Sequence, residues 1–266
     1  MKPLITILII IASIIFIIWL GLNIKPKPFP VDNRAQGKLE TGPLPEDLPV
    51  PVKRFFQTIY PDGVPVIDTV VLTGRGQISP FGFWLPTRFV MIHNAGRDYR
   101  HYFEATFFGF PILKVNEGYV DGESFFESPM GSYYDDPNTN QGANLALWAE
   151  GGWFPSLWVT DPRARWQAVD DNTAILYVPF EDKEENFIIR FDPKTGLVDK
   201  MEAMRFRAST DQEKILWITN DVRTENKPTI SYATWLDTGK PWLALTIDDI
   251  KFNLDVSEMI LARGYE

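Results

Sequence analysis

A continuous apolar stretch near the N-terminus restricts the fold of this chain more than any other feature. It begins at Leu4, ends at Leu22 and reads LITILIIIASIIFIIWLGL, with Thr6 and Ser13 as its only polar residues. As an α-helix rising 1.5 Å per residue, the stretch would be about 28 Å long, which matches the hydrocarbon core of a bilayer. Trp19 lies near its far end, where aromatic residues meet the membrane interface. The sequence therefore predicts a transmembrane helix.

A cleaved signal peptide is the alternative interpretation of this segment. Its apolar region would span about 7–15 residues and end at a small-x-small site, whereas this run is longer and Gly21-Leu22-Asn23 fits such a site poorly. We therefore expect an uncleaved signal-anchor over residues 1–22 and a single-pass membrane protein. Lys2 lies before the span and Lys25 and Lys27 follow it, so the positive charges nearly balance. We expect the short N-terminal tail inside and the globular domain on the extracytoplasmic side.

The remaining chain divides into a spacer and a domain. Prolines recur through residues 23–45, which predicts an extended, poorly packing spacer. Residues 46–266 are long enough for a single β-rich globular domain with a sizeable core. The absence of cysteine excludes disulfides, thiolate metal sites and a lipid-modified cysteine. A net charge of −9 does not suit a nucleic-acid partner, which requires a basic surface.

Strand patterns dominate the domain. In residues 98–108, Tyr99, His101 and Phe103 share one face, while Arg100 and Tyr102 share the other, as in a half-buried antiparallel strand. Similar segments follow one another across turn residues, and no β–α–β alternation occurs, so the fold class is mainly β (α+β), a long antiparallel meander. Helices are expected within residues 46–60, over residues 140–150, where the paired glycines 151 and 152 would end the helix, and over residues 257–263.

Metal and catalytic signatures are weak. Asp136, Asn138 and Asn140 imitate the start of a calcium loop, but Gln141 stands where glycine is required and Leu147 where glutamate is required. This segment is therefore expected to cap a helix.

The chain has two histidines, His93 and His101, and the apolar strand neighbours of His101 favour a satisfied structural side chain. None of the common hydrolase or phosphate-loop motifs is present. We accordingly expect no catalytic residue, no metal and no cofactor. Glu150, at a helix end beside Trp153 and Phe154, is the most interesting carboxylate.

A series of short motifs resembles a bacterial domain family of unknown function, over most of residues 46–253. The motifs are Leu48-Pro49-x-Pro51-Val52-x-Arg54-Phe55, Tyr119-Val120-Asp121-Gly122, Asn140-Gln141-Gly142-Ala143-Asn144-Leu145, Ala149-Glu150 before Trp153-Phe154-Pro155, Arg165-Trp166, Val169-Asp170-Asp171, Phe191-Asp192, Thr195-Gly196-Leu197-Val198, and Glu202-Ala203 with Arg205-Phe206. The family implies no activity.

The succession of strands and turns is also similar, at the level of the fold, to that of envelope carriers of the lipoprotein-localisation type. That likeness implies an open half-barrel-like sheet with a few covering helices around an apolar cavity, although those carriers have a cleaved signal.

The predicted ligand site lies between the sheet and the helix at residues 140–150, because aromatic residues concentrate there. Its residues are Trp148, Glu150, Trp153, Phe154, Phe103, Phe107, Met204 and Arg205. Glu150 or Arg205 would hold a polar head, and the rings would cover an apolar chain. The leading hypothesis is a non-catalytic, membrane-anchored extracytoplasmic domain that binds a lipid or other apolar ligand. An envelope structural or interaction protein with a solid core, and a carboxylate-based hydrolase, are the alternatives.

Overall fold

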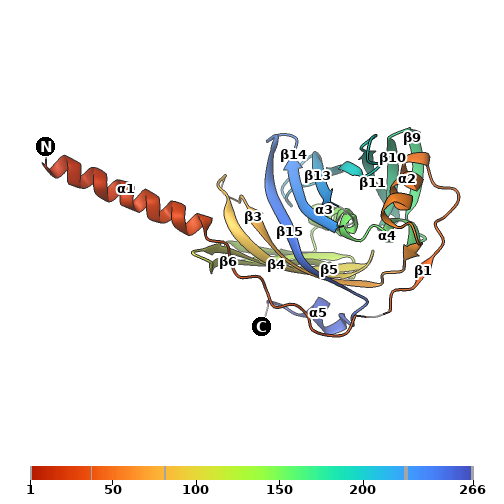
Figure 1. Ribbon diagram of the computed structural model, residues 1–266, viewed down its shortest axis with the longest axis horizontal. Coiled ribbons are helices and arrows are strands. Elements are labelled where there is room, and N and C mark those ends of the chain that lie inside the picture. Colours follow the sequence, from red (N-terminus) through yellow and green to blue (C-terminus); the bar gives the residue numbers. More distant parts are fainter. Residues whose placement is uncertain (1, 37, 81, 225–226, 265–266) are drawn as a thin grey trace.

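The computed structural model describes residues 2–36, 38–80, 82–224 and 227–264. One antiparallel sheet of thirteen strands dominates these residues (Figure 1), and β1 and β2 form a separate pair. The first half of the large sheet is a meander of β3 (Thr69–Ile78), β4 (Leu85–Asn94), β5 (Asp98–Phe107), β6 (Phe110–Val120), β7 (Glu123–Ser128) and β8 (Gly131–Tyr134). The second half is a meander of β9 (Arg165–Asp170), β10 (Thr173–Phe180), β11 (Lys183–Phe191), β12 (Val198–Arg205), β13 (Ile215–Thr224), β14 (Lys227–Trp235) and β15 (Lys240–Phe252).

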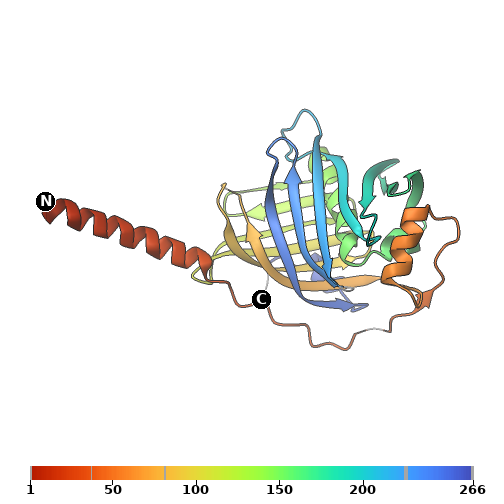
Figure 2. The same ribbon diagram turned by 45° about the horizontal axis from the view of Figure 1, so that its top comes forward.

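The two meanders meet in the middle of the sheet, where β15 pairs with β3. This leaves β8 and β9, which are consecutive along the chain, at opposite edges. The connection between them is helical and consists of α3 (Pro137–Ala149), the 3₁₀ turn η1 (Glu150–Trp153) and α4 (Leu157–Thr160). Because the sheet curves strongly, this connection lies inside the curve (Figure 2). The predicted mainly β class with an open, curved sheet and few helices is confirmed.

Helix α3 is buried on all sides, since every residue from Thr139 to Ala149 is buried. Its amide side chains bond to both halves of the sheet. The Asn140 carboxamide oxygen accepts hydrogen bonds from the backbone N–H and hydroxyl of Ser124 in β7. The Gln141 side chain donates to the backbone oxygen of Met204 in β12. A helix enclosed by a sheet has no solvent-exposed face, so its polar side chains need hydrogen-bond partners inside the protein. Asn140 and Gln141 find these partners in the strands.

The helix boundaries follow local chemistry. Asp136 caps α3 by accepting from two backbone N–H groups, which starts the helix three residues before the predicted Asn140 and confirms the capping interpretation of this segment. The paired glycines at 151 and 152 do not end the helical path, because it continues as η1 to Trp153. Short helices also occur at α2 (Val50–Ile59) and α5 (Ser257–Leu261), and β1 (Thr41–Gly42) pairs with β2 (Val64–Pro65).

Two apolar layers lie on the two faces of the sheet. The large inner core contains the helical connection and α2, and it includes Trp148, Phe154 and Trp158. A smaller outer layer covers the back of β3–β5 with α5 and with Phe29 from the proline-rich segment. The Phe29 ring lies 4.2 Å from the guanidinium carbon of Arg88, so this part of the spacer packs on the domain.

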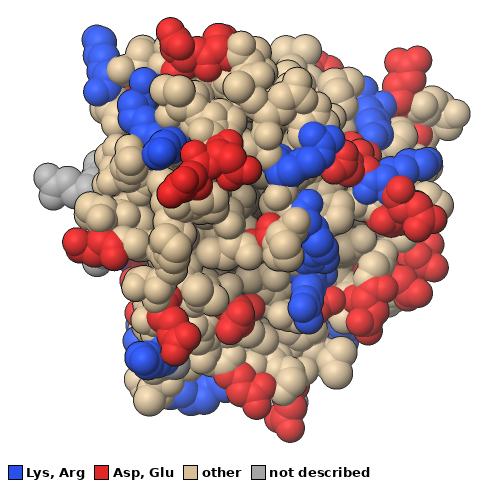
Figure 3. Space-filling view, turned by 90° about the vertical axis from the view of Figure 1, so that its right-hand side faces the viewer, with Lys and Arg blue, Asp and Glu red and all other residues tan. Residues whose placement is uncertain are grey.

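Helix α1 (Lys2–Asn23) projects away from the domain (Figures 1 and 2). It is the one helix among the described residues that is long and apolar enough to span a membrane, a property that a signal sequence shares. The β5–β6 turn touches its end, and the Phe108 backbone N–H donates to the Gly21 oxygen at 2.9 Å. The same hairpin exposes Phe110 by 74% and Ile112 by 58%. On the face opposite α1, acidic and basic side chains are interspersed (Figure 3).

Candidate functional site

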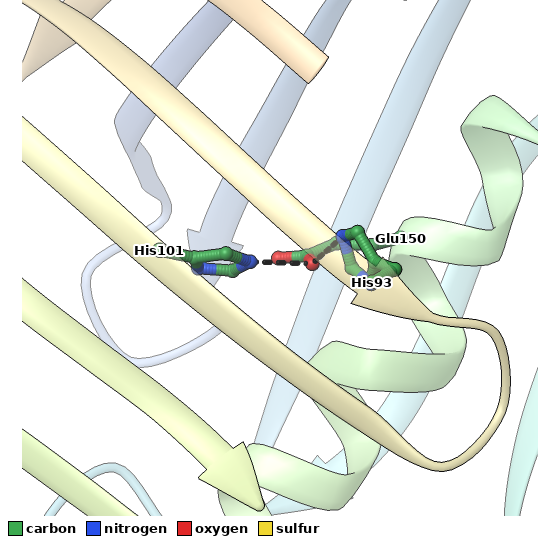
Figure 4. A group of neighbouring side chains, drawn as sticks. All are labelled: His93, His101 and Glu150. Atoms are coloured by element: carbon green, nitrogen blue, oxygen red, sulfur yellow. Dashed lines mark hydrogen bonds and ion pairs between the residues drawn. The ribbon is translucent and has the colours of Figure 1, made fainter. Parts of the chain in front are cut away.

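A cluster of three ionisable side chains lies between the sheet and the end of α3 (Figure 4). His93 comes from β4, His101 from β5, and Glu150 from the first residue of η1. The Nε2 atom of His101 lies 2.8 Å from Glu150 Oε2, and the Nε2 atom of His93 lies 3.1 Å from the same oxygen. Both imidazoles are almost completely buried, while the Glu150 side chain is 16% exposed. Two rings therefore converge on one carboxylate oxygen within the inner core.

Strand register brings the two histidines together. In the β4–β5 pairing, His93 lies opposite Tyr99 and His101 lies opposite Met91. The histidines are thus diagonal neighbours on one face of the sheet. Tyr99 packs beside them, with its ring centroid 4.3 Å from that of His101. Glu150 reaches this face because α3 crosses the inside of the sheet and ends there.

A second carboxylate touches the other side of His101. Glu117 in β6 lies opposite His101 in the sheet register, and its Oε1 atom is 3.2 Å from His101 Nδ1. His101 is consequently held by a carboxylate at each ring nitrogen. His93 differs, because its Nε2 contact with Glu150 is close but poorly directed, and neither ring nitrogen has a well-formed hydrogen bond within the described residues.

The pKa values of the cluster follow from burial and from these contacts. Burial lowers the pKa of His101, but Glu150 and Glu117 outweigh it and raise this pKa to about 9. Burial raises the pKa of Glu150, but His101 and His93 outweigh it and lower this pKa to about 2. Burial also lowers the pKa of His93, against the opposing effect of Glu150. Near neutral pH, the cluster thus contains an imidazolium, a carboxylate and a neutral imidazole.

A half-buried cation lies farther along the same face of the sheet. The guanidinium of Arg205 in β12 is 4.5 Å from the ring centroid of Trp217 and 5.6 Å from that of Trp235. Its Nε atom is buried without a hydrogen-bond partner, and no carboxylate pairs with Arg205 among the described residues. Gly142 of α3 covers it so closely that a Cβ atom there would lie 3.1 Å from Nε. Burial, partly offset by Tyr99 and by acidic groups, lowers the pKa of Arg205.

Comparison with known protein families gives one match, a family of unknown function designated DUF6544, over residues 38–244. The chain belongs to this family. A comparison with curated proteins finds no match. The histidine cluster and Arg205 all lie within the part of the chain that matches the family.

Solved structures with a similar fold include a LolA superfamily protein from Nitrosomonas europaea. It has a TM-score of 0.44 and 11% identity, and the match covers 80% of this chain and 96% of that protein. A DUF1329 family protein from Desulfovibrio piger has a TM-score of 0.41 and 10% identity, with 80% and 95% covered. The family match confirms the expected resemblance to a family of unknown function, and the LolA superfamily protein is among the structures that this chain resembles in fold.

The residues predicted for the ligand site of this DUF6544 protein separate into groups. Trp148, Trp153, Phe154 and Phe103 are buried together in the inner core. The fold brings Glu150 to the histidines and places Arg205 beneath α3.

Two of the predicted ligand-site residues lie elsewhere, and the prediction for them is corrected. Met204 is 50% exposed, because alternation along β12 turns Ala203 and Arg205 inward and Met204 outward. Phe107 lies against Gly21 at the end of α1.

Some residues of the histidine cluster and of the surroundings of Arg205 were not identified from the sequence. His93 was identified only as one of two histidines, and Glu117, Trp217 and Trp235 were not identified at all. The hairpin register of β4 and β5 carries a signal for the histidine pair, because residues paired across Asn94-Ala95-Gly96 place them on one face. Trp217 and Trp235 lie opposite each other in the β13–β14 register, but no local pattern relates them to Arg205, because residues 206–214 separate β12 from β13.

Proposed function

We propose that this protein is a membrane-anchored, non-catalytic binder of an amphipathic molecule with an anionic head, such as a fatty acid or an acidic lipid. The observation that carries the proposal is the Arg205 guanidinium, which is inside the curved sheet, stacks on tryptophan and has no carboxylate partner. Partial burial of a cation without an anion, here with Nε fully buried, is costly, and a ligand that supplies the anion lowers the cost.

The groups around Arg205 define the head of the ligand. Arg205 Nε and Trp217 Nε1 are both buried N–H donors, and neither has a partner in the part of the chain that the structure describes. Each can donate and neither can accept, so the complementary group is rich in acceptors. A carboxylate or phosphate meets this requirement, and hydrogen bonds between charged groups are stronger than neutral ones. The Trp217 and Trp235 rings against the guanidinium would be the apolar neighbours of the first part of a chain.

The anchor supports a membrane-derived ligand. We place α1 in the bilayer and the domain on the extracytoplasmic side. The β5–β6 turn beside Gly21 exposes Phe110 and Ile112, and these residues would then lie at the membrane interface. A domain held in this position is continuously exposed to amphiphiles that leave the membrane.

A titration of the full-length protein in nanodiscs tests the proposal. Oleate should quench or shift the tryptophan fluorescence saturably, because Trp217 and Trp235 lie beside Arg205, where the carboxylate of the ligand would bind. Methyl oleate, which lacks the charge, should bind at least tenfold more weakly. Arg205→Gln should weaken oleate binding by about 10- to 100-fold, the range expected for loss of a charge-assisted hydrogen bond.

Arg207→Gln is the matched control. Arg207 is two residues away, lies 5.7 Å from the Trp235 ring and is already paired with Asp237. It should leave oleate affinity unchanged. Absence of a saturable response in the wild type, or equal affinities of oleate and its methyl ester, would refute the proposal.

A structural or interaction protein is the second candidate. Trp148, Phe154 and Trp158 are 1% exposed or less and belong to one continuous packed core. Such packing is expected of a domain whose surface, instead of its interior, carries the function. A negative titration favours this candidate.

A further inference from the structure

We propose that His93, His101 and Glu150 bind a divalent transition-metal ion of the zinc type, and that Glu117 orients His101 for this role. The proposal departs from the expectation of no metal, because the sequence separates residues that the fold brings together. It is independent of ligand binding at Arg205.

The geometry is close to that of a coordination site. One ligand atom from each of the three residues lies within 4.8 Å of the others. Zinc bonds of about 2.0–2.2 Å at tetrahedral angles separate neighbouring ligand atoms by about 3.3–3.5 Å. The two observed Nε2–Oε2 distances of 2.8 and 3.1 Å are shorter by a few tenths of an ångström. The largest separation in the set, up to 4.8 Å, is longer than this range. An ion would therefore draw the two imidazoles toward each other while the Glu150 carboxylate rotates outward.

His93 supplies a second, independent observation. Its side chain is completely buried, and neither ring nitrogen has a well-formed hydrogen bond to any residue that the structure describes. Buried polar groups without partners are rare in folded proteins, and each needs a reason. Its Nε2 atom lies 3.1 Å from the carboxylate oxygen shared with His101 (Figure 4). Coordination of a metal would satisfy this nitrogen.

Glu117 provides the outer support that metal-binding histidines commonly have. It lies 3.2 Å from His101 Nδ1, on the opposite side of the ring from Glu150. Metal binding displaces the Nε2 proton of the His101 imidazolium, and the remaining Nδ1–H donates to Glu117 while the Nε2 lone pair binds the ion. The pairing is fixed by sheet register, because His101 and Glu117 lie directly opposite each other in β5 and β6.

The ligand set indicates the class of metal. Two imidazoles and one carboxylate suit zinc and similar ions, whereas calcium and magnesium prefer sites made of oxygen atoms alone. Three protein ligands leave a fourth tetrahedral position for water or another small ligand. Glu150 is 16% exposed, so its carboxylate is within reach of solvent.

The test uses full-length protein in detergent, stripped with chelator and then titrated with Co²⁺. One equivalent should produce the visible absorption of a tetrahedral cobalt site, and Zn²⁺ should remove that absorption. X-ray absorption of the zinc form should report two imidazole ligands. Zinc at 100 times its Kd should raise the unfolding midpoint by about 5–10 °C, and calcium should not.

Single substitutions test which residues bind the metal and which residue orients a ligand. Glu150→Gln should weaken zinc binding at least 100-fold. Glu117→Gln retains all three ligands and should weaken binding about 10- to 100-fold, as expected for an orienting residue. Glu202→Gln, a buried glutamate paired with Arg190 and Lys200, is the control and should bind as the wild type does.

The wild-type titration decides the proposal even if Glu150→Gln does not fold. Absence of a one-equivalent cobalt signal in wild-type protein would overturn it. Unchanged affinity in a folded Glu150→Gln variant, or a zinc spectrum without two imidazoles, would also overturn it.

Discussion

Gly151 lies where the chain leaves α3, and a methyl group there has no room. A Cβ atom at this position would approach Trp158 Nε1 to 2.6 Å, well inside van der Waals contact. Trp158 has little freedom to retreat, because it is 1% exposed and its indole N–H donates to the Trp148 backbone oxygen at 3.0 Å. Overpacking of this kind costs about 1–3 kcal/mol. Loss of the hydrogen bond adds about 1 kcal/mol.

The reduced entropy of the unfolded chain offsets about 0.4–1 kcal/mol of this cost. We therefore expect Gly151→Ala to lower the free energy of unfolding by about 2.3 kcal/mol, the centre of a range of about 1–3.6 kcal/mol. For a domain of this size, the central value lowers the unfolding midpoint by about 5–9 °C.

Thermal unfolding of the full-length protein in detergent, followed by tryptophan fluorescence, measures the effect. Gly42→Ala is the control, because a Cβ atom there meets nothing within 4 Å. It should shift the midpoint by no more than about 2 °C. Equal midpoints for Gly151→Ala and Gly42→Ala would refute the packing described around Trp158.

Three further substitutions test the core, a helix cap and a buried ion pair. Trp148→Ala should cost about 3–5 kcal/mol in urea unfolding, because Trp148 is fully buried in the inner core, and a loss below about 1 kcal/mol would contradict that packing. Asp136→Ala removes the acceptor for two backbone N–H groups and should cost about 1–2 kcal/mol, whereas an unchanged midpoint would contradict the cap. Burial raises the pKa of Glu202, but Arg190 and Lys200 outweigh it and lower this pKa below its usual value. The stabilisation by Glu202 is therefore present above about pH 4.5 and lost as the pH falls through the lowered value. Glu202→Gln should thus be less stable than the wild type at pH 7 and nearly as stable in strong acid, and a pH-independent difference would argue against the pair.

The strands were predictable because their periodicity is local. Alternation along residues 98–108 and the turn at Asn94-Ala95-Gly96 identify β4 and β5 without knowledge of the rest of the fold. The burial of α3 was not predictable in this way. The polar run before Asn144 resembles a solvated loop, but its amides bond to strands that are distant in the sequence. The enclosure of α3 follows from β8 and β9 lying at opposite edges, which is a property of the whole sheet.

The candidate site shows the same division. Strand alternation predicted the inward face of His101, and the helix end marked Glu150 as a carboxylate of interest. Their contact joins residues 49 positions apart and depends on where α3 crosses the sheet. Alternation along β12 likewise separates Arg205 from Met204, and this phase was not apparent from the sequence.

Native mass spectrometry of the full-length protein, extracted from membranes in a mild detergent, tests the central claim most directly. We predict that the wild type carries one anionic amphiphile per chain. Arg205→Gln should lose that adduct, and Arg207→Gln should keep it. A wild-type protein without a bound amphiphile, or an adduct equally abundant in Arg205→Gln, would contradict the proposal that Arg205 holds the head of a ligand.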